Sequence, residues 1–156
     1  MSLLKIERFL TESNGIEGLF RPPLSSEINA TATFLTSPLT LDNLLTVQAV
    51  YAPDMSLRES PGMNVRIGTY YPPPGGPKIR QALIYLLGMI NDKSLSPWEA
   101  HIRFEGLHPF LDGNGRSGRV LWAYHMQLVG KDPFALDFLH RFYYQTLENM
   151  DREDRN

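Results

Sequence analysis

Apolar side chains recur at helical intervals over much of the chain. The pattern predicts a short helix over 3–10, a second over 27–35 that ends before Pro38, and a third over 41–51. Gln48 shares the apolar face of the third helix. The residues able to cap these helices are Ser25 or Ser26 for the second and Thr40 for the third.

The helical pattern resumes in the second half of the chain. An apolar segment over 79–90 predicts one helix, and Ser96 followed by Pro97 is typical of the start of the next. Residues 120–129 are apolar on most sides, as expected of a buried central helix. A last helix is predicted over 134–150. The chain is therefore expected to be mostly α, with about six or seven helices around a buried one.

Residues 53–77 interrupt this pattern, because they are rich in proline and glycine. Within them, the segment NVRIGTYY alternates in a way that indicates a strand or one arm of a small hairpin. The residues on one side of this segment are Val65, Ile67, Thr69 and Tyr71. One small β element is therefore expected among the helices.

Composition narrows the class of protein. A length of 156 residues suits a single domain over 1–156, and fifteen Lys and Arg against seventeen Asp and Glu give a net charge of −2. Because basic residues are not in excess, nonspecific nucleic-acid binding is not expected. The absence of cysteine excludes disulfides and thiolate metal sites. No apolar run is long enough to span a bilayer, and no signal-peptide core is visible, so we expect a soluble, cytoplasmic protein without membrane contact.

One segment, HPFLDGNGRSGR at 108–119, gathers the residues best suited to chemistry. Its glycines satisfy the dinucleotide pattern G-x-G-x-x-G, but that pattern requires a preceding strand in a βαβ unit, and here a capped helix precedes it. The phosphate-loop pattern is excluded because no G-K-[ST] follows. Glu105 and His108 have the E-x-x-H spacing of di-iron bundles, but the chain has no second copy of that spacing.

The segment instead indicates an anion site at the start of a helix. The glycines on either side of Asn114 allow successive backbone N–H groups to point the same way, and a helix that begins near Arg116 adds its positive end. Arg116 and Arg119 lie on one face of the first turn, where cations are unfavourable unless an anion lies between them. This combination predicts a site for a polyphosphate.

His108 and Asp112 supply the remaining groups that such a site needs. Mg²⁺ is commonly held by one or two carboxylates together with phosphate oxygens, so Asp112 is the candidate metal ligand. Histidine titrates near neutrality, so His108 is the candidate base for an attacking hydroxyl. Each residue also has a structural explanation, as a turn residue or a helix cap, but those explanations do not account for all of them in one short segment.

The segment resembles the signature of Fic-domain proteins, H-P-F-x-[D/E]-G-N-G-R-x-x-R, at every specified position. The resemblance extends over 3–150, since the helix order and the small hairpin also agree. It implies the Fic fold, mostly α, with about six to eight helices around a buried central helix and a β-hairpin flap at about 63–76. Members that keep the full motif mostly transfer AMP from ATP to a hydroxyl side chain of a protein. We therefore expect a Mg²⁺-dependent protein adenylyltransferase.

The resemblance implies a role for each position of the motif. His108 would act as the general base on a Ser, Thr or Tyr hydroxyl of the target protein, and Asp112 would bind Mg²⁺. Phe110 would anchor the loop in the core. The phosphate-binding positions would be Gly113, Asn114, Gly115, Arg116 and Arg119, with Arg119 reaching the γ-phosphate.

A second family motif, the inhibitory [S/T]-x-x-x-E-[G/N], resembles SNGIEG, which begins at Ser13. In relatives its glutamate pairs with the second arginine of the signature, which implies that Glu17 pairs with Arg119 and displaces the γ-phosphate. The inhibitory segment would cover about 3–18. A turn with an exposed glutamate is the alternative interpretation, and Gly15 is unfavourable for a helix there.

The flap is the third element that the resemblance implies. Its backbone would bind a target protein as an added strand, and the alternative is a hairpin that only covers the core. The docking residues would be Val65, Arg66, Ile67, Gly68 and Thr69.

Three functions are compatible with these residues. The first is an autoinhibited adenylyltransferase that modifies a protein target, or itself. The second is a hydrolase that removes AMP from a modified protein, with Glu17 positioning a water. The third is a nucleotide-binding interaction module with vestigial catalysis. A homo-oligomer also agrees with the resemblance, whereas the target protein cannot be read from the signature.

Overall fold

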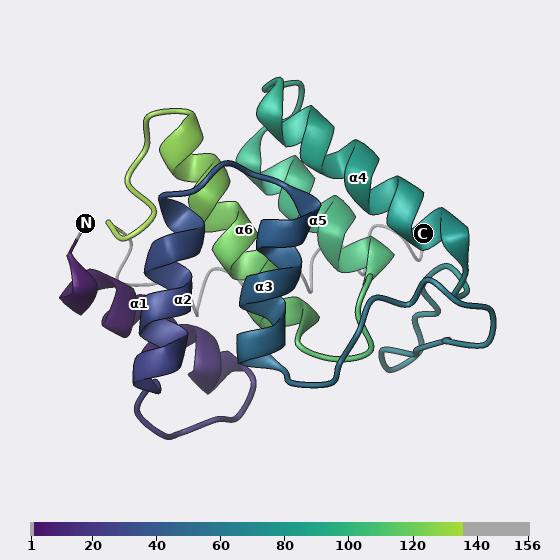
Figure 1. The fold of residues 1–156 in the computed structure, drawn as a ribbon, viewed down its shortest axis with the longest axis horizontal. Helices are drawn as coiled ribbons and strands as arrows, with labels where there is room; N and C mark the ends of the chain where they lie inside the picture. Colours follow the sequence, from purple (N-terminus) through teal and green to yellow (C-terminus); the bar gives the residue numbers. More distant parts are fainter. Residues whose placement is uncertain (1, 136–156) are drawn as a thin grey trace.

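The computed structural model describes residues 2–135, which form six helices joined by loops (Figure 1). Within this part of the chain there is no sheet, so the prediction of a mostly α fold is confirmed. None of these helices has the length and apolar character needed to cross a membrane. The helix predicted over 134–150 falls beyond the described residues. The helices are α1 (Leu3–Ile16), α2 (Ser25–Leu35), α3 (Leu41–Tyr51), α4 (Pro77–Asn91), α5 (Pro97–Leu107) and α6 (Asn114–Leu128).

Helix α6 is the predicted central helix. It packs against α1, α2, α3 and α5, and Figure 1 shows it among those helices. Its residues Val120, Leu121 and Ala123 are buried, which explains why this stretch is apolar on most sides. Because α6 begins directly after the loop of the motif, its first turn lies where several helices meet.

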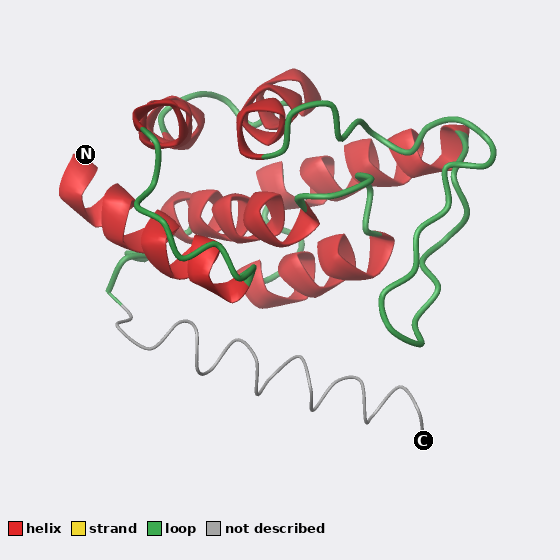
Figure 2. Ribbon diagram, turned by 90° about the horizontal axis from the view of Figure 1, so that it is seen from below, coloured by secondary structure: helices red, strands yellow, loops and turns green. Residues whose placement is uncertain are grey.

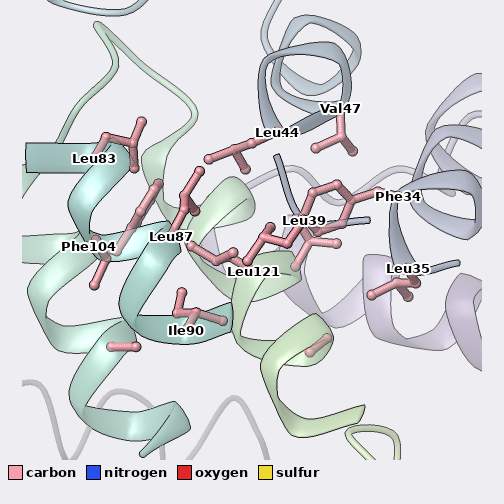
Figure 3. Packing of buried hydrophobic residues seen from close by; sticks show 14 of the residues in the cluster. Phe34, Leu35, Leu39, Leu44, Val47, Leu83, Leu87, Ile90, Phe104 and Leu121 are labelled. Atoms are coloured by element: carbon pink, nitrogen blue, oxygen red, sulfur yellow. The ribbon is translucent and has the colours of Figure 1, made fainter. Parts of the chain in front are cut away.

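Apolar side chains from different helices form the core around α6. Leu44 on α3, Leu87 on α4 and Leu121 on α6 lie close together in Figure 3 and belong to one buried cluster. Burying a leucine side chain contributes roughly 1.5–3 kcal/mol to folding. Phe104 on α5 and Phe34 on α2 extend the same cluster on either side. This packing fixes α5 and α6, and hence the loop that joins them.

Two of the predicted helix caps are present, and one is displaced. The Thr40 hydroxyl accepts the Asn43 N–H at 3.1 Å, and the Ser96 hydroxyl accepts the Glu99 N–H at 3.2 Å. The prediction that Ser25 or Ser26 caps α2 is wrong, because the helix begins at Ser25 with Leu24 as its N-cap. The Leu24 N–H donates to the carboxylate of Glu27 at 2.8 Å, which is the half of a capping box that leucine can still make without a hydroxyl.

Helix α1 is longer than the predicted 3–10, since it continues to Ile16 and includes Gly15. Ser13 and Asn14 in its last turn are buried. The Ser13 hydroxyl accepts the Nε–H of Arg119, on α6, at 2.7 Å. Tertiary contact therefore outweighs the low helix propensity of this last turn.

The connection from α3 to α4, residues 52–76, is a long loop that projects from one side of the helices (Figure 2). The expected β element was a strand or one arm of a small hairpin, and no strand forms over 64–71. Within that segment only Ile67 and Tyr70 pair, through reciprocal N–H···O bonds of 2.9 and 2.8 Å. Gly68, with φ of 57°, and Thr69 form the turn between them. The expected flap is thus a two-residue turn on a loop and has no extended ladder.

Candidate active site

The site begins at the end of α5, where His108 is the C-cap residue. Its backbone is left-handed, with φ of 48° and ψ of 61°, and its N–H donates to the Phe104 carbonyl at 2.9 Å. Histidine is one of the residues that adopt this conformation most often, and it ends the helix here. The ring is half-buried, and within residues 2–135 its Nδ1 atom has no hydrogen-bond partner.

Burial lowers the pKa of the His108 imidazole below its usual value. The nearby Arg58 guanidinium acts in the same direction, whereas the Glu105 carbonyl and the carboxylates of Asp112 and Glu17 oppose it. The imidazole is therefore neutral at pH 7, which is the form that can accept a proton.

Asn114 holds the loop between α5 and α6 in shape. Its side-chain oxygen accepts the Phe110 N–H at 2.9 Å, and its side-chain nitrogen donates to the Phe110 carbonyl at 2.8 Å. Phe110 itself is fully buried, as expected of the anchor of the loop. The side-chain amide of Asn114 thus bonds the protein itself, which leaves the backbone N–H groups at the start of α6 as the donors for a phosphate.

Gln48 supports the same loop from α3. Its Nε2 donates to the Asp112 carbonyl at 2.7 Å, and its Oε1 accepts the Ser117 hydroxyl on α6. Gly113, between them, has φ of 81°, and an added Cβ would meet the side chains of Gln48 and Ala52. Glycine is therefore required at this position by both conformation and space. In the sequence, Gln48 lies on the apolar face of the helix. A polar amide on a face that will be buried is the signal that could have indicated its support of the loop.

The predicted metal ligand, Asp112, lies at the exposed tip of the loop. Its Oδ1 accepts the Gly113 N–H at 2.8 Å, which fixes the carboxylate, and Oδ2 takes no part in this bond. No group of three or more candidate metal-ligating side chains occurs within residues 2–135. A single ordered carboxylate fits Mg²⁺, which takes few protein ligands when phosphate oxygens complete its coordination.

Arg119 is buried and fully engaged with the end of α1. Its Nε donates to the Ser13 hydroxyl at 2.7 Å, and its Nη2 donates to the Ser13 carbonyl at 3.0 Å and to Glu17 Oε1 at 2.7 Å. The Glu17 carboxylate also lies against the backbone of Gly115, where an added Cβ would collide with it. An internal carboxylate thus occupies the first turn of α6, where a helix attracts anions.

Arg116 is held by α2 and α3. Its Nη1 lies 3.5 Å from Glu27 Oε2, and its guanidinium carbon lies 5.7 Å from the centre of the Tyr51 ring. Its side chain is only 10% exposed. Sequence reasoning missed both neighbours, because neither lies near the motif in the chain.

Arg58 is a further residue whose role sequence reasoning missed, and it is fully buried. Burial lowers its pKa, and no carboxylate pairs with it in the described part of the chain. Its N–H groups instead donate to four carbonyls. These belong to Met63 (3.0 Å), Pro73 (2.9 Å), Leu107 (2.9 Å) and His108 (2.7 Å). Arg58 therefore ties the backbone of His108 to the base of the 52–76 loop. Nothing in the residues around Arg58 marks this role.

Replacing Arg58 with methionine is expected to lower the free energy of unfolding by at least about 3 kcal/mol, because buried carbonyls lose their donors. The matched control is Arg80→Met, which removes an exposed arginine paired with Glu59 at 3.2 Å and should cost at most about 1 kcal/mol. Urea unfolding followed by circular dichroism measures both. Equal losses in the two variants would contradict the assigned role of Arg58.

The flap residues remain on the surface. Arg66, Gly68 and Thr69 are exposed, Ile67 is 42% exposed, and Val65 is half-buried. The loop is attached to α5 by the hydroxyl of Tyr70, which donates to the Gly106 carbonyl at 2.7 Å. This anchor brings the loop near the end of the helix that carries His108, and target docking stays a prediction.

Residues 38–126 match the model of the Fic/DOC family. The match includes α3, α4, α5 and most of α6, together with the whole segment 108–119, and it covers more than half of the chain. Glu17 and Glu27 precede it. On this match, and on the helical fold that agrees with it, the chain belongs to the Fic/DOC family.

Proposed function

We propose that this protein is an autoinhibited adenylyltransferase, which transfers AMP from ATP to a hydroxyl side chain of a protein. The observation that carries the proposal is the position of Glu17, whose carboxylate binds Arg119 at 2.7 Å and lies against Gly115. These are two of the groups that the motif assigns to phosphates. A carboxylate and a phosphate compete for the same donors, and this competition supports an inhibitory role for Glu17.

In the proposed reaction, the hydroxyl oxygen of the target attacks the α-phosphorus of ATP. The bond from that phosphorus to the bridging oxygen of the β-phosphate breaks, and pyrophosphate leaves. His108 accepts the hydroxyl proton, while Arg116, Arg119 and the backbone N–H groups at the start of α6 hold the phosphates. Asp112 is the residue that would hold Mg²⁺, which when bound neutralises phosphate charge.

The proposal is tested with the Glu17→Gly variant, ATP labelled on the α-phosphate, Mg²⁺ and a cell lysate. Label is expected on a protein, with an AMP adduct found by mass spectrometry on Ser, Thr or Tyr, and chelation of Mg²⁺ should abolish it. No label on any protein, including the variant itself, would overturn the proposal. Loss of label on adding the wild-type protein would instead favour AMP removal.

The pH dependence of His108 is a further expected result. Because burial lowers its pKa, the imidazole should lose its proton with a midpoint below 6.5, and the base form should predominate at pH 7. The ring resonance of His108 in NMR spectra, assigned by its loss in His108→Ala, measures this midpoint without any activity assay. A midpoint above 6.5 would show that the neighbouring carboxylates outweigh burial.

A further inference from the structure

Glu27 is a buried carboxylate at the start of α2, and it is 1% exposed. It accepts the Nη1–H of Arg21 at 2.7 Å and the N–H of Leu24 at 2.8 Å, and its second oxygen lies 3.5 Å from Arg116 Nη1. Burial opposes its ionisation, but Arg21, the Leu24 N–H and Arg116 together hold the pKa of Glu27 below its usual value. The carboxylate is therefore ionised and fixed in place.

The two arginines of the motif are held in different ways. Arg119 makes three hydrogen bonds to α1, one of them to Glu17, whose side chain is 39% exposed at the end of a helix. Arg116 makes one long contact to Glu27, which is itself secured by Arg21 and Leu24. Glu17 is partly exposed, whereas Glu27 is buried and bonded to Arg21 and to the Leu24 N–H, so Glu17 is the better suited of the two to move away. Glu27 is therefore not suited to be a second releasable inhibitor.

Charge and geometry both leave Arg116 available to a phosphate. One carboxylate is shared between Arg21 and Arg116, so the group keeps a net positive charge. The Tyr51 ring lies 5.7 Å from the guanidinium, and the Tyr51 hydroxyl is fixed at 2.5 Å from that of Thr31. A guanidinium oriented by a carboxylate and an aromatic ring still has N–H groups directed away from both.

We propose that Glu27 is a positioning residue, which orients Arg116 so that its remaining N–H groups meet the phosphates of ATP. This inference rests on the proposed function of the same site. It adds a residue that lies outside the motif and precedes the matched part of the chain. It also assigns the two glutamates opposite effects: Glu17 obstructs ATP, whereas Glu27 promotes its binding.

The test measures the dissociation constant of ATP with Mg²⁺ by calorimetry, in the Glu17→Gly background and without any target protein. Glu27→Gln keeps an acceptor for the Leu24 N–H but removes the charge that orients Arg116. We expect ATP to bind about tenfold more weakly. In the Arg116→Ala variant, the same Glu27→Gln change should alter binding less than about twofold, because the oriented group is gone.

The matched control is Glu59→Gln, which removes an exposed carboxylate paired with Arg80 and should leave ATP binding unchanged. Unchanged or tighter ATP binding in Glu27→Gln would overturn the proposal, since a competing carboxylate strengthens binding when it is removed. If Glu27→Gln weakens ATP binding equally in the presence and absence of Arg116, the proposal is also overturned, because the substitution then acts on the fold in general and not through Arg116.

A second variant keeps the test valid if Glu27→Gln does not fold. Glu27→Asp retains the charge but shortens the side chain, so Arg116 should lose its orientation, and ATP should bind at least about threefold more weakly. Unchanged binding would contradict the proposal. Because these assays contain no acceptor protein, they do not depend on AMP transfer. Failure to label any protein in the lysate experiment would refute the proposed function, whereas ATP binding by these variants would still test the inference on Glu27.

Discussion

His108→Ala, made in the Glu17→Gly background, is expected to lower the rate of AMP transfer by about 100- to 10,000-fold. The half-buried imidazole is neutral at pH 7 because burial lowers its pKa, and no other described side chain is assigned to the hydroxyl proton. ATP affinity should change less than about threefold, because the phosphate donors belong to α6 and its loop. Radiolabel incorporation measures the rate, and calorimetry measures the affinity.

His108→Ala is informative because it should lower the rate of AMP transfer and leave the affinity for ATP nearly unchanged. Exogenous imidazole, added to His108→Ala, should restore part of the rate by occupying the space that the side chain leaves. If the rate of transfer stays within about threefold of the background, the hydroxyl loses its proton to another group and the assignment of His108 is wrong. If ATP affinity and melting temperature fall together, the loss reports a damaged loop.

Glu17→Gly is expected to raise the rate of AMP transfer by roughly 10- to 150-fold over the wild type, the range that one charge-assisted hydrogen bond provides. In the wild type, the Glu17 carboxylate accepts a hydrogen bond from Arg119 Nη2 at 2.7 Å and lies against the Gly115 backbone. Removing it frees both groups for the γ-phosphate and unblocks the first turn of α6. ATP affinity should rise as well, which calorimetry measures.

The control for this variant is Glu7→Gln, which removes one negative charge from an exposed position of the same helix. It should leave both the rate and the affinity unchanged, because it touches neither arginine. If Glu7→Gln raises the rate of AMP transfer as much as Glu17→Gly does, the activation results from the change in net charge and not from loss of the contact with Arg119. If Glu17→Gly binds ATP no more tightly than the wild type, the contact with Arg119 does not obstruct the nucleotide.

Local signals accounted for the helices and for part of the site. The caps at Thr40 and Ser96 were predictable because a hydroxyl and its N–H partner lie only three residues apart. The loop and the first turn of α6 were also predictable, because the residues of the motif that form them are close together in the sequence. The contact of Glu17 with Arg119 bridges distant parts of the chain, and it was expected only through the resemblance. The contact of Ser13 with Arg119 was not predicted.

The remaining features depend on contacts that no local pattern encodes. The partners of Arg58 lie on three different segments, and Glu27 meets Arg116 across most of the chain. The strand prediction failed because the alternation over 65–71 reflects a turn at Gly68, whose positive φ closes the pairing after one bridge. Alternation alone does not distinguish a strand from an exposed loop.

The guanidinium of Arg58 has an evolutionary consequence. Its N–H groups donate to the carbonyls of Met63 and Pro73 and to that of His108. The residues between Met63 and Pro73 therefore begin and end beside the His108 backbone. Changes of sequence between these two anchors would leave the Arg58 bond to the His108 carbonyl in place, whereas loss of Tyr70 would remove the bond to the Gly106 carbonyl. The exposed residues between the two anchors can therefore vary without loss of the Arg58 bond that fixes the His108 backbone.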